Sequence, residues 1–211
     1  MADNYLEKKM ELFKQRSATV AAKGKGALSA LLLKNRSTRG FDASFKVRKD
    51  QLCRIVGVNG KVASARNAQV LRFRLVTGDE CGKVLPYIKM GSALSELNLP
   101  LPGTEPNAFV VVCSTVEPRP STYIDLGISV QSMLLQAVEI GLNGLCIKAF
   151  DKEKIKESLG LPFEPLMVLA LGKSAEKIEL VDIKACDNHA YYREDGVHYV
   201  PKVVIDDLII E

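Results

Sequence analysis

The sequence predicts an α+β domain in which helices cover both faces of a β-sheet, and three features predict it. Residues 70–77 (VLRFRLVT) alternate apolar and polar side chains with a period of two, as in a half-buried strand. Residues 109–113 and 166–171 are short, continuous apolar runs, which are typical of central strands. Residues 126–141 are apolar on nearly every side, which predicts a buried helix.

Size and composition exclude several classes of protein. The chain has 211 residues, of which 47% are hydrophobic and 26% charged, so it is long enough to bury a core and is not disordered or fibrous. No apolar run reaches the roughly 18 to 20 residues of a membrane helix. The net charge is only +4, without a concentrated basic stretch, so neither a membrane nor a nucleic acid is an expected partner.

The first 26 residues are predicted to be a charged N-terminal extension, helical over residues 4–16 and ended by the KGKG at 23–26. Because mixed charges stand where a secretory signal has an apolar centre, we expect a cytoplasmic protein. The five cysteines are odd in number and widely spaced, without a CxxC pair. They are expected to be reduced thiols, and no metal site is expected.

Residues 27–211 are predicted to form a single domain. Residues 27–34 (ALSALLLK) are expected to form a short helix, which the chain leaves through the loop NRSTRGFD at 35–42. A helix or turn is expected around residues 52–58, and the polar SARNAQ at 64–69 precedes the first strand.

Residues 78–107 are rich in Gly, Pro and Ser and are expected to form an excursion or lid that ends at the strand 109–113. Asp125 is expected to cap the helix 126–141, with Gly141 just past its end.

The second half continues with a short strand over residues 145–150 and a charged helix that Asp151 caps and that runs to Leu159. After the strand 166–171, residues from about 173 to 211 form a polar arm with a last strand expected over 203–210. A late strand after a long polar arm often packs on a partner subunit. We therefore expect a homodimer with exchanged C-terminal arms.

Three short segments could bind a ligand. Arg36, Ser37 and Arg39 place two guanidinium groups and a hydroxyl within four residues, a set that suits a phosphate. The alternative is that these cations only complement the dipole of the preceding helix.

Asn67 and Gln69 are two residues apart, so in an extended chain their amides face one way and could pair with the edge of a heterocycle. A polar turn is the alternative. The main-chain N–H groups of Lys148 and Ala149 follow a predicted strand, where ligands of α/β sheets tend to bind, although a plain strand-to-helix turn would have the same sequence.

Other chemistries have little support. The sequence contains no GxGxxG, GxxxxGK[ST], GxSxG or HExxH motif. We expect no catalytic or metal-binding role for His189 or His198. With no evident general base, a reaction here would need a cofactor to carry electrons.

Together these segments resemble the FMN-dependent nitroreductase family. RSTRGFD at 36–42 is similar to the family's RRSxRxF opening, SARNAQ to its PSGGNxQPW loop, and GLNGLCIKAFD at 141–151 to its G-L-G-x-x-x-I-x-x-F-D segment. DLGISVQSMLLQAVEIGL resembles the long helix at the family's dimer core, and VHYVPKVVIDDLII resembles its C-terminal extension. The resemblance runs from about Leu31 to the C-terminus.

The resemblance implies a three-layer sandwich with a mixed sheet flanked by helices, a long core helix at the dimer interface and a C-terminal strand exchanged with the partner. It also implies one FMN in each of two interface sites. The residues implied to bind FMN are Arg36, Ser37 and Arg39 at the phosphate and ribityl chain or the pyrimidine edge, Asn67 and Gln69 at the pyrimidine ring, and Lys202 at the phosphate. The main chain of Lys148 and Ala149 is implied to approach flavin N5 from the partner subunit, and Ile147 is implied to contact the cofactor beside them.

The activity implied is a transfer of hydride from NADH or NADPH to flavin N5 and then to a nitroaromatic, a quinone or a related small acceptor, in alternating half-reactions. No protein side chain is implied to be catalytic. Specialised members that act on a flavin or on halogenated or quinone-like substrates are one alternative. A flavin-binding homodimer with a sensing or structural role is another. The side chain of Lys148 could face either the flavin or solvent.

Overall fold

The computed structural model describes residues 27–91 and 98–210, and the chain divides into two units, residues 1–35 and 36–211. In the first unit, residues 27–34 form the expected helix, and the N–H of Asn35 donates to the carbonyl of Leu31 at its end. The helix expected over residues 4–16 lies outside the described residues. Within residues 27–91 and 98–210, no helix has the length and apolar character needed to cross a membrane.

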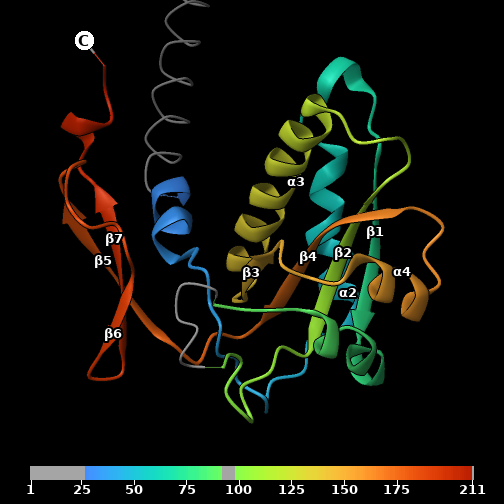
Figure 1. The fold of residues 1–211 in the computed structure, drawn as a ribbon, viewed down its shortest axis with the longest axis horizontal. Helices are drawn as coiled ribbons and strands as arrows, with labels where there is room; N and C mark the ends of the chain where they lie inside the picture. Colours follow the sequence, from blue (N-terminus) through green and yellow to red (C-terminus); the bar gives the residue numbers. More distant parts are fainter. Residues whose placement is uncertain (1–26, 92–97, 211) are drawn as a thin grey trace, which may run out of the picture. The chain divides into compact units, whose positions relative to one another are not determined.

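The second unit is built on a four-stranded sheet (Figure 1). Its strands lie in the order β1-β2-β4-β3, and each neighbouring pair is antiparallel. β2 and β4 are central, which explains their continuous apolar runs, and the predictions for these strands and for β1 are confirmed. The strand bounds are β1 Leu71–Thr77, β2 Ala108–Ser114, β3 Asn143–Ile147 and β4 Glu164–Gly172.

Helices cover both faces of this sheet, as predicted. On one face, α2 (Lys49–Val56) and α3 (Pro120–Glu139) bury their apolar sides against β2 and β4. On the other face, α4 (Lys152–Leu159) and the 3₁₀ helix η3 (Gly78–Lys83) do the same. The result is a three-layer α+β sandwich, as expected from the sequence. Its four strands are all antiparallel, however, and not mixed as the family resemblance implied.

The segment expected to be an excursion contains η3 and a second 3₁₀ helix, η4 (Leu85–Tyr87). Its described part contributes Cys81, Val84 and Met90 to the buried cluster beneath α4. This part of the segment therefore belongs to the layer that covers the sheet.

The helix α3 differs from its prediction in two ways. It begins at Pro120 and not after Asp125, because proline is favoured in the first turn of a helix, where its missing N–H costs nothing. It is also not buried on all sides, since Ile124 is 63% exposed and Tyr123 and Ile128 are exposed beside it. Gly141 does lie just past the end, with φ of +80°, as expected.

The C-terminal arm forms a second, three-stranded sheet in the order β5-β7-β6, with β5 (Lys177–Ile183) parallel to β7 (Val197–Val203) and β6 (Tyr192–Glu194) antiparallel to it. The prediction of a strand over 203–210 is wrong, because β7 ends at Val203 and a 3₁₀ turn, η6 (Ile205–Asp207), follows. The reason is the Asp195–Gly196 turn. Both residues have positive φ, which suits a tight hairpin and sets the pairing of β7 from Val197 onward.

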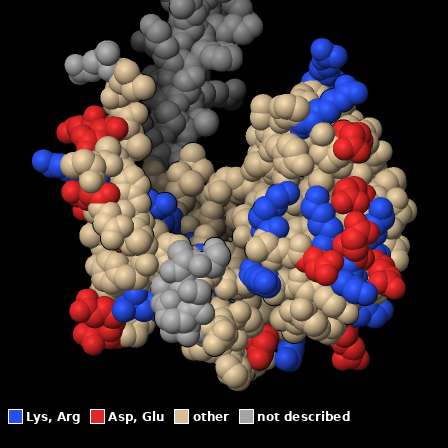
Figure 2. Space-filling model, in the orientation of Figure 1, with Lys and Arg blue, Asp and Glu red and all other residues tan. Residues whose placement is uncertain are grey.

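Charged side chains of both signs are interspersed on the face around α4 (Figure 2). Lys152 and Lys156 both pair with Glu164, and Lys83 pairs with Glu80. Because these charges offset one another, this face presents no single-sign field of the kind that attracts a polyanion.

Cys81 and Cys113 should resist thiol reagents while the protein is folded. Burial, with the nearby charges of Glu80 and Glu164 respectively, raises the pKa of each thiol to about 11, so almost no thiolate is present at pH 8. Cys146 is exposed as a residue, but burial of its thiol raises the pKa to about 11 as well. Cys53 and Cys186 are also exposed. Labelling at pH 8 followed by mass spectrometry should modify these two in the native protein and the buried pair only after unfolding. Prompt modification of Cys113 would contradict the fold described here.

Candidate functional site

The basic loop lies along β3 at one edge of the main sheet. Ser37 forms a parallel bridge with Gly144, and the N–H of Thr38 donates to the Gly144 carbonyl at 3.3 Å. The N–H of Arg36 donates to Oδ1 of Asn143 at 3.2 Å. The main chain of the loop is therefore fixed by the strand beside it, which leaves Ser37 exposed.

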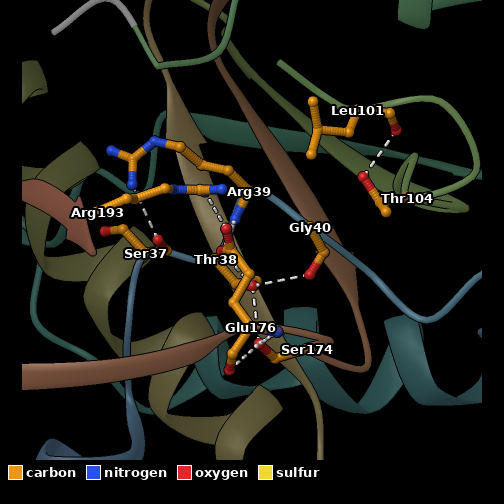
Figure 3. Close-up of polar contacts among 9 residues, drawn as sticks. All are labelled: Ser37, Thr38, Arg39, Gly40, Leu101, Thr104, Ser174, Glu176 and Arg193. Carbon is orange, nitrogen blue, oxygen red and sulfur yellow. Dashed lines mark hydrogen bonds and ion pairs between the residues drawn. The ribbon is translucent and has the colours of Figure 1, made fainter. Parts of the chain in front are cut away.

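A carboxylate from the arm holds the other side of this loop (Figure 3). Oε2 of Glu176 accepts hydrogen bonds from the Thr38 hydroxyl at 3.0 Å and the Arg39 N–H at 2.5 Å, and Oε1 pairs with Arg193. Only 11% of the Glu176 side chain is exposed. Sequence reasoning missed this residue, because a single glutamate in a polar segment carries no signal of a contact 137 positions away.

The two guanidinium groups of the loop have different surroundings. Arg36 is half-buried, and burial lowers its pKa. Arg39 donates to the carbonyl of Ser37 at 3.1 Å, and its guanidinium lies 4.8 Å from the centre of the Tyr191 ring. Arg39 is thus directed toward the arm.

The SARNAQ loop brings its two amides together. Nε2 of Gln69 donates to Oδ1 of Asn67 at 3.0 Å, and both side chains are exposed. We had expected an extended chain here, and this prediction is wrong. Ala65–Asn67 form a 3₁₀ turn, and Arg66, Asn67 and Gln69 all have positive φ. Such φ values are unfavourable for residues other than glycine, so the loop needs external support.

Asp125 gives that support. It is 5% exposed, and its Oδ1 accepts the N–H of Ala65 at 2.8 Å, while the hydroxyl of Ser64 accepts the N–H of Gln69. Asp125 therefore caps this turn and not α3, the helix that it was expected to cap. It also lines two cavities beside the loop, of about 220 Å³ and 510 Å³.

Replacing Asp125 with alanine should lower the free energy of unfolding by about 1 kcal/mol, because the lost charged hydrogen bond outweighs the gain in helix propensity. Asp125→Asn, which keeps an acceptor oxygen, should lower it less. Urea unfolding of both variants checks this ranking. Equal losses in the two variants would show that the bond to Ala65 is not what Asp125 contributes.

At the end of β3, Ile147 is buried, and Lys148 and Ala149 are exposed. Within the described parts of the chain, neither Lys148 nor Ala149 donates its main-chain N–H, although both carbonyls accept hydrogen bonds. Nζ of Lys148 donates to the Leu166 carbonyl at 3.0 Å and lies 5.3 Å from the centre of the Tyr123 ring. The lysine side chain is thus held by β4 and α3. Burial, with the charge of Lys152, lowers its pKa.

Lys202 lies apart from the other candidate residues. It is exposed on β7, with Asp182 of β5 as its neighbour in the sheet, and its side chain forms no hydrogen bond or ion pair within residues 27–91 and 98–210. The structure does not bring it to the loop 36–39.

One chain does not assemble all of the candidate residues. The loop 36–39 and the end of β3 share one edge of the sheet, whereas the loop 64–69 precedes β1, the strand at the opposite edge. Four strands span roughly 14 Å at their usual spacing. Among the described residues, no hydrogen bond or ion pair joins the two loops. The same residues contain no cluster of three or more His, Cys, Asp or Glu side chains able to hold a metal ion.

Residues 32–173 match the model of the nitroreductase family. Among solved structures, a nitroreductase family protein from Clostridium difficile 630 is 25% identical, with a TM-score of 0.56 over 69% of this chain and 83% of that one. An FMN and NADPH-dependent nitroreductase from Sphigopyxis sp. strain HMH is 19% identical, with a TM-score of 0.59 over 70% of this chain and 88% of that one. No curated protein matches.

Proposed function

Because this chain belongs to the nitroreductase family, we propose that it is an FMN-dependent oxidoreductase that uses NADH or NADPH as hydride donor. The observation that supports this best is the place of the family's motifs in the fold. The basic loop 36–39 and the main-chain N–H groups of Lys148 and Ala149 lie along the same strand, β3, within the matched region.

The chemistry of these donors fits FMN. Arg36 and Arg39 are cations beside the exposed hydroxyl of Ser37, which suits a phosphate. The Gln69 side-chain NH₂ donates to the Asn67 side-chain carbonyl. The Asn67 NH₂ remains as a donor and the Gln69 carbonyl as an acceptor, which is what a pyrimidine edge requires. The N–H groups of Lys148 and Ala149 are suited to an acceptor nitrogen of the flavin. FMN, when bound, supplies the acceptance and donation of hydride.

In this proposal the protein binds and orients. Arg36 balances the charge of the phosphate, Arg39 lies at the ribityl chain or the pyrimidine edge, and the amides of Asn67 and Gln69 fix the ring in its plane. Lys148 keeps its ammonium on the Leu166 carbonyl, so its contribution to the site is its main-chain N–H. Nicotinamide and acceptor use the site in turn, and the acceptor is a nitroaromatic, a quinone or a related small molecule.

A homodimer completes the site in this proposal. The exposed apolar side chains of Tyr123, Ile124 and Ile128 on α3 provide a face for a second copy, which would bring a loop 64–69 to a loop 36–39. The C-terminal residues Ile205, Leu208 and Ile210 are also exposed and apolar, which supports an arm that packs on the partner. Light scattering of the purified protein should give twice the chain mass of 23.1 kDa.

Reconstitution with FMN tests the binding step. The stripped protein should take up one FMN per chain, with flavin absorbance that stays with the protein through gel filtration. Arg36→Gln should weaken FMN binding by about tenfold or more, because it removes a charged contact to the phosphate. Arg54→Gln is the matched control, since Arg54 is exposed and pairs with Glu139 on the surface. Equal FMN affinity in the two variants would remove Arg36 from the site.

A further inference from the structure

His198 is a buried histidine with no partner. It lies on β7, is 2% exposed, and neither ring nitrogen forms a hydrogen bond with any residue that the structure describes. The ring of Tyr191 lies beside it, at 5.2 Å between centres. Because an unpaired polar group is unfavourable in the interior, such a histidine calls for an explanation.

The imidazole lines a cavity of about 210 Å³ between the loop 36–40 and the arm, here called the arm pocket. Its wall also contains Arg39, Glu176, Arg193, Leu99 and Leu101. The cavity is smaller than the roughly 300–1,000 Å³ of pockets for drug-sized ligands, so its occupant is small.

The charges of the arm pocket leave one cation in excess. Glu176 accepts hydrogen bonds from the Thr38 hydroxyl and the Arg39 main-chain N–H, and its carboxylate pairs with the Arg193 guanidinium. One carboxylate therefore stands against the two guanidinium groups of Arg39 and Arg193. Lys177 also reaches the wall but pairs with Glu179 at 2.8 Å. A single negative charge would balance the pocket.

The surroundings of the imidazole favour its neutral form. Burial, and then the charges of Arg39 and Arg193, lower the pKa of His198, and only Glu176 acts in the opposite direction. A neutral imidazole has one N–H to donate. The pocket is thus lined by two guanidinium groups, one neutral donor and the apolar residues Leu99 and Leu101.

We propose that the arm pocket binds a small monocarboxylate with an apolar body, its carboxylate held by Arg39, Arg193 and His198 and its body against Leu99 and Leu101. The site joins the loop 36–40 to the arm, so an occupant would hold these two segments together. Arg39 is shared with the proposed FMN site, and the carboxylate is therefore a second ligand beside the flavin.

Calorimetric titration of benzoate into the FMN-saturated full-length protein tests this site. We expect saturable binding of one benzoate per chain, and no comparable binding of inorganic phosphate. His198→Phe keeps an aromatic ring against Tyr191 but removes the donor, so it should weaken benzoate binding by about tenfold or more. Because His198 has no protein partner to lose, this variant should melt no lower than the wild type. His189→Gln, which changes the chain's exposed histidine, is the control and should bind benzoate normally.

Nitrogen NMR of the histidine rings gives a second test that needs no variant. Benzoate should shift the ring resonances of His198 and leave those of His189 in place. Absence of saturable binding, equal affinity for phosphate, or unchanged affinity in His198→Phe would each overturn the proposal. Benzoate binding to the FMN-free protein alone, and not to the FMN-saturated protein, would do so as well, because it would assign the pocket to the flavin.

Discussion

Replacing Glu176 with alanine should lower the free energy of unfolding by about 3 kcal/mol, the lower end of the range for a broken buried ion pair. The side chain is 11% exposed and accepts hydrogen bonds from Thr38 and the Arg39 main chain while it pairs with Arg193. Its removal takes this partner from the Arg39 N–H and the Arg193 guanidinium, whereas the Thr38 hydroxyl keeps its contacts with Gly40 and Ser174. Arg193 is 27% exposed, and this access to water keeps the cost from being larger.

Urea unfolding measures this loss, and Glu179→Ala is the matched control. Glu179 belongs to the same arm, but its pair with Lys177 is exposed on both sides, so its removal should leave stability nearly unchanged. FMN affinity should also fall in Glu176→Ala, because the loop 36–39 loses one of its two supports. If the two variants unfolded at the same urea concentration, Glu176 would not be what holds the loop.

Replacing Gly144 with alanine should cost about 2–3 kcal/mol of stability, near the top of the range for overpacking. An added Cβ would lie 2.7 Å from the Ala170 carbonyl oxygen and 2.8 Å from methyl groups of Leu134 and Leu171. The carbonyl belongs to β4, in the centre of the sheet, and cannot move aside without breaking the ladder.

The same substitution should disturb the site, because Gly144 bridges Ser37 and accepts the N–H of Thr38. Gly57→Ala is the control. Gly57 has ordinary helical φ and ψ at the end of α2 and nothing within 4 Å of an added Cβ, so this variant should be as stable as the wild type or slightly more so. Thermal unfolding with and without FMN compares the two. A Gly144→Ala protein as stable as Gly57→Ala would show that β3 and β4 do not approach as described.

Local patterns in the sequence were enough to predict most of the main sheet. The period of two in β1, the continuous apolar runs of β2 and β4, and the Asp151 cap of α4 all depend on neighbours in the chain, and each is confirmed. In β2, every residue is buried, so the absence of alternation correctly indicated a central strand.

Features that depend on distant residues were missed. Asp125 has the right chemistry for a cap, but its partner is the N–H of Ala65, 60 positions away. Glu176 is similarly joined to Thr38 across 138 positions. The last strand was predicted at the wrong position for a different reason. The Asp195–Gly196 pair is a local hairpin signal that predicts a strand from Val197, whereas the prediction followed the apolar run further along the chain.

The candidate site was predicted in pieces and not as a whole. The basic loop, the amide pair and the end of β3 each have the expected chemistry. Their places in the sheet could not be predicted, because strand order sets them and sequence periodicity does not report strand order. The order β1-β2-β4-β3 puts the amide pair and the basic loop at opposite edges, and this separation is the reason for proposing that two chains complete the site.

The most direct test of the proposed function is an anaerobic titration of the FMN-loaded protein with NADH and, separately, with NADPH, followed by addition of a nitroaromatic or a quinone. The account predicts that flavin absorbance falls with at least one nicotinamide and returns when the acceptor is added. Bound FMN whose absorbance neither nicotinamide changes would contradict an oxidoreductase and would favour a flavin-binding homodimer with a sensing or structural role.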